Sequence, residues 1–229
     1  MPIFRAEEEG AVRGLLARLE RPVELALVLG PYSTTTLAGA REIDPEVETR
    51  RILAGLAELS ELVTVSEHGE GALGADRYPA VVLLRDGADT GVRFYGTPWG
   101  YELTSIVGAV LEAGTAKSSL LSGSTAALAA LDVDLDVEVY VTPTCPHCPR
   151  AVLLAYRAAL ASPRVTAAGV EATEFPALAD RYGVLAVPKV VVNGVPRYEG
   201  SVPEHVFVER LLASGRDGSP TVSDTVREL

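Results

Sequence analysis

Nine consecutive residues, Val141 to Pro149 (VTPTCPHCP), contain both cysteines of this 229-residue chain. Cys145 and Cys148 are three positions apart, whereas a disulfide that staples a fold normally closes a longer loop. The same spacing is typical of chemically active thiol pairs. A strand-like run at 137–141 precedes the pair, and a segment compatible with a helix covers 148–161. We therefore expect a redox-active pair at the junction of a buried strand and a helix.

Composition and charge exclude several classes of partner. Apolar residues make up 48% of the chain and charged residues 22%, which is usual for a globular protein. The net charge of -11 argues against nucleic acids and anionic lipid surfaces, which require a basic face. The start, MPIFRAEEEGAVRGLL, lacks the pattern of a secretory signal, and no apolar run reaches membrane-spanning length. We expect a cytoplasmic protein without a nucleic-acid or membrane partner.

The chain repeats one order of elements. Each half is expected to contain a helix, a strand, a second helix, a second strand, a hairpin that a proline opens, and a final helix. In the first half the first helix, first strand, second helix, hairpin and final helix are 8–19, 23–29, 47–62, the hairpin 78–98 with its Asp86-Gly87 turn, and 101–112. In the second half they are 125–131, 137–141, 148–161, the hairpin 187–203 with its Asn193-Gly194 turn, and 204–213.

These elements predict an α/β fold. A strand–helix–strand connection is right-handed and gives a parallel pair, and each hairpin adds antiparallel strands to the same sheet. Helices are expected on both faces of each mixed sheet. Small and polar residues cluster at 114–124 (GTAKSSLLSGS), which predicts two units, 1–116 and 117–213. The polar segment 214–229 is expected to be a flexible tail.

This order resembles the thioredoxin fold, with Cys-x-x-Cys directly after a strand and Val-Pro at the start of a hairpin. The duplication resembles protein disulfide oxidoreductases, or glutaredoxin-like proteins, which have two tandem thioredoxin units. The resemblance covers residues from about 10 to 213 and is most specific at 141–152, 177–194 and 91–102. A related tandem unit forms the front of the flavoprotein component of alkyl hydroperoxide reductase, where only the second unit keeps its cysteines. The resemblance implies two tandem thioredoxin-like folds and thiol–disulfide oxidoreductase activity on proteins.

The first unit departs from the family pattern. Family members commonly carry a second Cys-x-x-Cys there, but this chain has GPYSTTTLAGA at 30–40, with Thr34 and Leu37 aligned to the cysteine positions. A threonine hydroxyl neither ionises near neutral pH nor forms a disulfide, so we expect this unit to be redox-silent. Pro79 matches the proline position of the fold. The first unit is therefore expected to dock or position substrates, or alternatively only to stabilise the second unit.

The chemistry of the pair assigns different roles to the two cysteines. The N-terminus of a helix favours negative charge, so Cys145 is expected to form the attacking thiolate. Cys148, one turn inside the helix, is expected to resolve the mixed disulfide. Pro146 is expected in the first helical turn, where it costs no hydrogen bond. His147 either tunes the Cys145 sulfur or is an exposed residue without effect.

Two further positions take expected roles near this pair. In the thioredoxin fold the Val187-Pro188 peptide bond is cis, and the resemblance implies that Val187 and Pro188 hold an extended substrate segment. The alternative is a proline that only begins a strand. Glu171 lies on the intervening strand, where it is either solvated or able to relay a proton from Cys148.

Several alternatives remain open. Cys-x-x-Cys is half of a zinc ligand set, but no second pair exists, and His68 and His205 fall in unrelated segments, so we expect no metal. The chain lacks a G-x-G-x-x-G fingerprint and is expected to bind no cofactor. Electrons would come from a thioredoxin-reductase-like flavoprotein or from glutathione. The competing functions are an electron carrier between a flavoprotein reductase and a peroxiredoxin, an iron–sulfur cluster shared by two chains, and a non-catalytic binding module.

Overall fold

The computed structural model describes residues 3, 5–31, 44–116 and 118–216. The elements of the first half are α1 (Ala6–Leu16), β1 (Val23–Val28), α2 (Pro45–Ala57), β2 (Val63–His68), the 3-10 turn η1 (Ala72–Gly74), β3 (Ala80–Arg85), β4 (Ala88–Tyr95) and α3 (Glu102–Gly114). Those of the second half are α4 (Ser122–Ala129), β5 (Leu135–Val141), α5 (Cys148–Ala161), β6 (Val165–Glu171), α6 (Pro176–Arg181), β7 (Lys189–Val192), β8 (Val195–Glu199) and α7 (Glu204–Arg216). The sequence did not predict η1 and α6.

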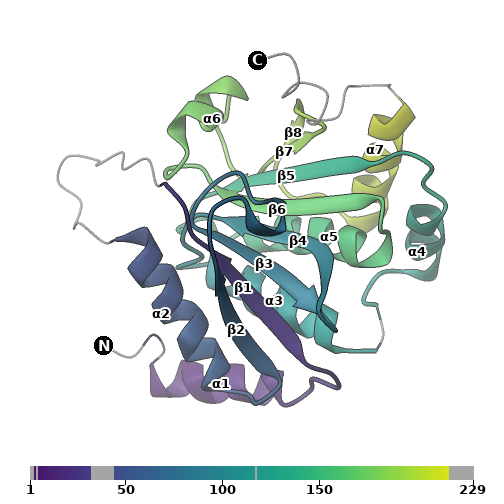
Figure 1. The fold of residues 1–229 in the computed structure, drawn as a ribbon. Helices are drawn as coiled ribbons and strands as arrows, with labels where there is room; N and C mark the ends of the chain where they lie inside the picture. Colours follow the sequence, from purple (N-terminus) through teal and green to yellow (C-terminus); the bar gives the residue numbers. More distant parts are fainter. Residues whose placement is uncertain (1–2, 4, 32–43, 117, 217–229) are drawn as a thin grey trace.

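All eight strands form one sheet in the order β2-β1-β3-β4-β6-β5-β7-β8 (Figure 1). Each half contributes four strands with the same pairing: β1 is parallel to β2 and antiparallel to β3, as β5 is to β6 and β7. The predicted α/β class and the mixed sheets are confirmed. The halves meet where β4 pairs in parallel with β6, a join that the sequence did not predict.

The two hairpins have the turn geometry that their sequences predict. Asp86 and Gly87 have φ angles of 53° and 75°, and Asn193 and Gly194 have angles of 51° and 70°. Positive φ at both central residues defines a type I′ turn, which matches the twist of the flanking strands. Each hairpin also has a shift of register between its two strands. The internal repeat therefore extends to the backbone conformation of single residues.

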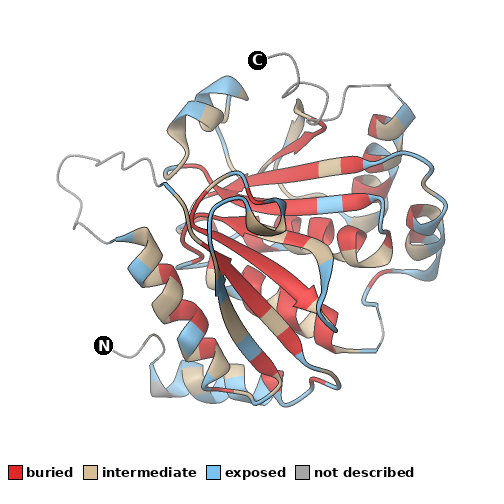
Figure 2. Cartoon of the chain, in the orientation of Figure 1, coloured by how far each residue is buried: buried red, intermediate tan, exposed pale blue. Residues whose placement is uncertain are grey.

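The helices cover the two faces of the sheet unequally. One continuous core lies beneath α1, α2, α3, α4, α5 and α7 and includes strand residues of both halves. The opposite face is covered by the segment around η1, which contributes Tyr78, and by α6 with its flanking residues Phe175 and Tyr182. Strands β3, β5 and β6 are therefore buried along most of their length, whereas β4 is buried mainly in its second half (Figure 2). Helices were expected on both faces. Six of the described helices cover one face, and the other face is covered by α6 and the η1 segment.

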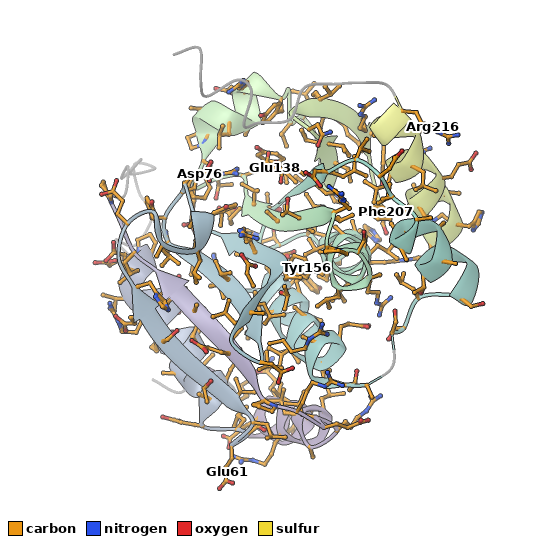
Figure 3. All side chains as sticks on the ribbon, turned by 45° about the vertical axis from the view of Figure 1, so that its right-hand side comes forward. Glu61, Asp76, Glu138, Tyr156, Phe207 and Arg216 are labelled. Carbon is orange, nitrogen blue, oxygen red and sulfur yellow. A yellow bond between two sulfur atoms is a disulfide. The ribbon has the colours of Figure 1, made fainter. Side chains whose placement is uncertain are left out.

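The two halves share side-chain contacts as well as a sheet. Helix α3 packs against α5, and at this boundary Arg157 Nε lies 2.7 Å from Glu112 Oε1. The hydroxyl of Tyr156, in the interior in Figure 3, donates to the carbonyl oxygen of Arg93 at 2.8 Å. A Cβ at Gly169 would lie 2.7 Å from the Phe94 ring. The repeat units predicted from the sequence thus form one packed body in this structure.

A buried ion pair crosses the boundary on the other face. The Arg77 guanidinium lies 2.6 Å from Glu138 Oε1 and 3.0 Å from Asp76 Oδ1, and it stacks 4.1 Å from the centroid of the Tyr95 ring. Burial opposes the charge, but Glu138 and Asp76 outweigh it and raise the pKa of Arg77. Figure 3 labels Asp76, in the segment between η1 and β3, near Glu138 on β5. This arginine therefore connects the η1 segment of the first half to β5 of the second.

Two predictions concern residues at the edges of the described structure. Helix α7 continues to Arg216 with Ser214 buried, so residues 214–216 belong to the helix rather than to a flexible tail. Residues 217–229 lie outside the described residues, as do Thr34 and Leu37, the aligned cysteine positions of the first half.

Candidate active site

Both cysteines lie where strand β5 turns into helix α5. The amide N–H of Cys145 donates to the Thr142 carbonyl at 3.1 Å, which closes the turn after the strand. Helix α5 begins at Cys148, so Cys148 is its first residue rather than a residue one turn inside. Pro146 consequently precedes the helix, and Pro149 occupies the first-turn position that Pro146 was expected to fill.

Cys145 and Cys148 form a disulfide with a Cα–Cα distance of 5.5 Å. Cys148 is completely buried, whereas Cys145 keeps 8% of its surface exposed. Of the two residues, Cys145 is therefore the one that keeps some contact with solvent. Cys145, the predicted attacking residue, is thus the outer of the two, and Cys148, the predicted resolving residue, is the inner one.

The Val187-Pro188 segment lies against the reactive pair. Its peptide bond is cis, as the resemblance implies, and the carbonyl oxygen of Val187 lies 3.8 Å from Cys145 Sγ. Pro188 is buried, and its own carbonyl accepts a hydrogen bond from Gly200 N–H at 2.7 Å. Val187, two residues before β7, is thus held next to the Cys145 sulfur.

The two residues between the cysteines are exposed. His147 is the N-cap residue of α5, but its side chain makes no capping hydrogen bond. A polar group that does lie beside the Cys145 sulfur is the Val187 carbonyl. Pro146 and His147 therefore present their side chains to solvent beside the disulfide.

Glu171, the last residue of β6, is buried rather than solvated. It pairs in register with Val141 at the end of β5 and is 1% exposed. Burial raises the pKa of its carboxyl group to about 7, although the Thr173 hydroxyl donates to Oε2 at 2.6 Å and favours the charged form. Among the described residues, Oε1 has no hydrogen-bond partner. The solvated alternative for Glu171 is therefore wrong.

A second buried carboxyl group, Glu102, comes from the first half. It is the first residue of α3 and is 0% exposed, and its Oε2 accepts from the Ser105 hydroxyl at 2.7 Å. Burial raises its pKa to about 7, and the nearby Glu171 charge adds to the effect. The sequence analysis missed Glu102 because an acidic residue in a first helical turn normally complements the helix dipole in solvent.

The segment that precedes Glu102 contacts the loops of the second half. The amide N–H of Tyr101 donates to the Pro143 carbonyl at 2.9 Å, and that of Thr97 donates to Glu174 Oε1 at 2.9 Å. Gly100 has a φ angle of 62°, and a Cβ there would lie 2.4 Å from the Pro143 oxygen. The half without cysteines thus forms one side of the cysteine loop.

The described ranges contain neither a metal centre nor a membrane span. No group of three or more His, Cys, Asp or Glu side chains in them could hold a metal ion. His68 instead lies 2.9 Å from the Ser66 hydroxyl, on β2. No helix in these ranges is both long and apolar enough to cross a membrane.

Comparison with known proteins identifies relatives of the whole tandem arrangement. A family model described as a thioredoxin domain matches residues 135–213. The alkyl hydroperoxide reductase component AhpF of Pseudomonas putida is 30% identical over 179 residues, which cover 78% of this chain and 32% of that protein. The AhpF protein of Escherichia coli is 28% identical over 183 residues, with 80% and 32% covered. The chain spans about a third of the length of these relatives.

Solved structures extend the match to nearly the full chain. The N-terminal domain of AhpF from Enterococcus faecalis has a TM-score of 0.81 and 27% identity, covering 91% of this chain and 99% of that one. A protein disulfide oxidoreductase from Aeropyrum pernix has a TM-score of 0.80 and 27% identity, with 95% and 96% covered. This chain therefore contains a thioredoxin-like domain and is homologous to the N-terminal domain of AhpF and to protein disulfide oxidoreductase.

Proposed function

We propose that this protein is a thiol–disulfide oxidoreductase that exchanges disulfides with protein substrates through Cys145 and Cys148. The observation that carries the proposal is the asymmetry of the pair. Cys145 is the partner with exposed surface and lies 3.8 Å from the Val187 carbonyl, and Cys148 is buried beneath it. A nucleophile must be reachable, whereas a resolving thiol must wait within reach of the mixed disulfide.

The exchange proceeds in two balanced steps. In the reduced protein, the Cys145 thiolate attacks one sulfur of a substrate disulfide, forms a mixed disulfide and releases the other substrate sulfur as a thiolate. Cys148 then attacks Cys145 Sγ, forms the disulfide seen in the structure and releases the second substrate thiolate. Two electrons pass from the cysteine pair to the substrate, and the reverse sequence oxidises a substrate dithiol.

Substrate positioning is assigned to Val187 and Pro188, and tuning of the pair to Pro146 and His147. The Val187 carbonyl lies beside the reacting sulfur, which suits pairing with an extended polypeptide segment. Pro146 and His147 lie exposed between the two cysteines, so a substitution there alters the electrostatic surroundings of Cys145 without disturbing the core. A change in reduction potential on replacing His147 would support the tuning role.

Glu171 is assigned as the group that takes up the proton of Cys148 when this thiol attacks. Its carboxyl oxygen Oε1 lacks a hydrogen-bond partner among the described residues, and its pKa of about 7 suits proton exchange near neutral pH. Glu171 pairs with Val141, four positions before Cys145, so it lies beneath the cysteine turn. Replacing Glu171 with Gln should shift the pH dependence of the resolving step, which single-turnover kinetics measures.

A second candidate function is an electron carrier between a flavoprotein reductase and a peroxiredoxin. The similarity to the N-terminal domain of AhpF favours it. The same sulfurs would then serve a fixed pair of partners. A thioredoxin-reductase-like flavoprotein or glutathione is proposed as the source of electrons, and a cytoplasmic location accords with reduced thiols.

The test of the main proposal is the reduction of insulin with dithiothreitol as the electron source. We expect activity in the wild type and none in Cys145→Ser. In a separate experiment without dithiothreitol, reduced Cys148→Ser should accumulate a mixed disulfide with its substrate, because no resolving thiol is left, and the mass of this species identifies the trapped partner. Recovery of one peroxiredoxin from a cell extract would favour the carrier function, and many trapped proteins the general one. If Cys145→Ser reduced insulin as fast as the wild type, both the general function and the carrier function would be refuted.

A further inference from the structure

The two halves differ in the loop that connects the hairpin to the final helix. In the second half, three residues (201–203) separate Gly200 from α7. In the first half, five residues (97–101, TPWGY) separate Gly96 from α3, and we call this segment the 97–101 loop. The two extra residues therefore belong to the half that has no cysteines.

The 97–101 loop is built against the cysteine loop of the other half. Its Tyr101 N–H donates to the Pro143 carbonyl at 2.9 Å, and only a glycine fits at position 100, where a Cβ would lie 2.4 Å from the same oxygen. Pro143 is two residues before Cys145, a separation that the backbone spans in at most about 7 Å. The loop is thus fixed beside the reactive sulfur.

Large apolar side chains are concentrated around this site. Seven such side chains are exposed among the described residues, and three of them flank the cysteines. Trp99 and Tyr101 are 50% and 49% exposed on the 97–101 loop, and Leu185 is 93% exposed two residues before Val187. Exposed aromatic groups next to a reactive atom are typical of contact residues in protein interfaces.

We propose that Trp99 and Tyr101 contact the polypeptide segment next to the disulfide that Cys145 attacks, and so select protein substrates. The occupant is an extended segment of a disulfide-bearing protein with an apolar side chain near its cysteine. Val187 lies on one side of that segment and the 97–101 loop on the other, with Leu185 completing the apolar rim. The half without cysteines thereby acts as a specificity element, an inference that rests on the proposed function.

Kinetics with two disulfides tests this role. Insulin presents a polypeptide segment to the 97–101 loop, whereas hydroxyethyl disulfide has a disulfide but no polypeptide segment for Trp99 and Tyr101 to contact. The ratio of kcat/KM for insulin to that for hydroxyethyl disulfide should fall about tenfold in Trp99→Ala and in Tyr101→Ala. Val47→Ala, which removes a side chain that is 55% exposed on α2, should keep the wild-type ratio. An unchanged ratio in both loop variants would overturn the proposal.

A binding measurement separates this inference from the proposed function. Trp99 is the single tryptophan of the chain, so its fluorescence reports on the 97–101 loop alone. In a Cys145→Ser, Cys148→Ser variant, which cannot exchange disulfides, adding insulin should shift the Trp99 emission. Emission that stays constant across the titration would contradict the contact, whatever the activity. Wild-type protein that reduces neither disulfide would instead refute the proposed function.

Discussion

Pro79 and Pro188 begin equivalent hairpins in the two halves, and the surroundings of these hairpins differ. In each half the proline carbonyl accepts a hydrogen bond from the glycine after the second strand, Gly96 at 2.8 Å and Gly200 at 2.7 Å. Beside Pro188, however, the Val187 carbonyl faces the Cys145 sulfur. The first half has no cysteine at all. The frame of the unit is therefore maintained by strand pairing and turn geometry and does not require the thiols.

The largest expected effect is the loss of activity when either cysteine is replaced and the fold is kept. Cys148→Ala and Cys145→Ala should each abolish insulin reduction while the fold persists, because the first half keeps the same frame without cysteines. Activity and the far-ultraviolet circular dichroism spectrum measure the two outcomes. A loss of folded structure in Cys145→Ala would show that the second half, unlike the first, depends on its disulfide.

The ion pair between the halves gives the next largest effect. Arg77→Met should lower the free energy of unfolding by about 3 kcal/mol, because Glu138 then stays buried without its cation. Urea denaturation measures this loss. Arg164→Met is the matched control, since the Arg164–Asp134 pair is more than half exposed on both sides and should contribute below about 1 kcal/mol. Two separate unfolding transitions in Arg77→Met would indicate that the pair couples the halves.

Stability should also depend on pH through Glu102. A glutamate in the unfolded chain ionises near 4.5, whereas burial keeps Glu102 protonated to about pH 7 in the folded protein. The folded state thus binds more protons between these values, and stability falls as pH rises from about 4.5 to about 7. Glu102→Gln lacks this loss, so its stability relative to wild type should rise by up to about 3 kcal/mol between pH ~5 and pH ~9.

The control for that measurement is Glu61→Gln, because Glu61 is exposed at the periphery of the molecule (Figure 3). The difference in stability between Glu61→Gln and wild type should be the same at pH ~5 and at pH ~9. Thermal unfolding at each pH provides the comparison. A Glu102→Gln variant that behaves like Glu61→Gln would show that Glu102 ionises normally despite its burial.

The smallest effect contrasts two helical glycines of the first half. A Cβ at Gly108 would lie 2.5 Å from Leu153 Cδ2 across the α3–α5 contact, whereas a Cβ at Gly14 on α1 meets nothing within 4 Å. Gly14→Ala should stabilise the protein by about 1 kcal/mol through helix propensity. Gly108→Ala should lose that gain or destabilise by about 1 kcal/mol, because the core must shift. Equal stabilisation in both would mean that the halves pack loosely.

The hairpins and the cysteine site could be predicted because their signals are local. Asp86-Gly87 and Asn193-Gly194 adopt positive φ angles that few other residue pairs tolerate, so two residues suffice to specify each turn. Helix α6 escaped prediction because its six residues are too few to establish a periodic pattern. The burial of Glu171 could not be predicted either, because the sequence of a strand does not indicate which other segment packs over the end of that strand.

By itself, the sequence determined that two similar α/β units follow one another and that one of them carries a Cys-x-x-Cys pair after a strand. Those features depend on side-chain periodicity, turn residues and spacing within short segments. Only the tertiary structure decided that β4 and β6 join the units, that Glu102 lies buried near Glu171, and that the 97–101 loop borders Cys145. Such contacts join residues far apart in the chain, and no local pattern encodes which surfaces will meet.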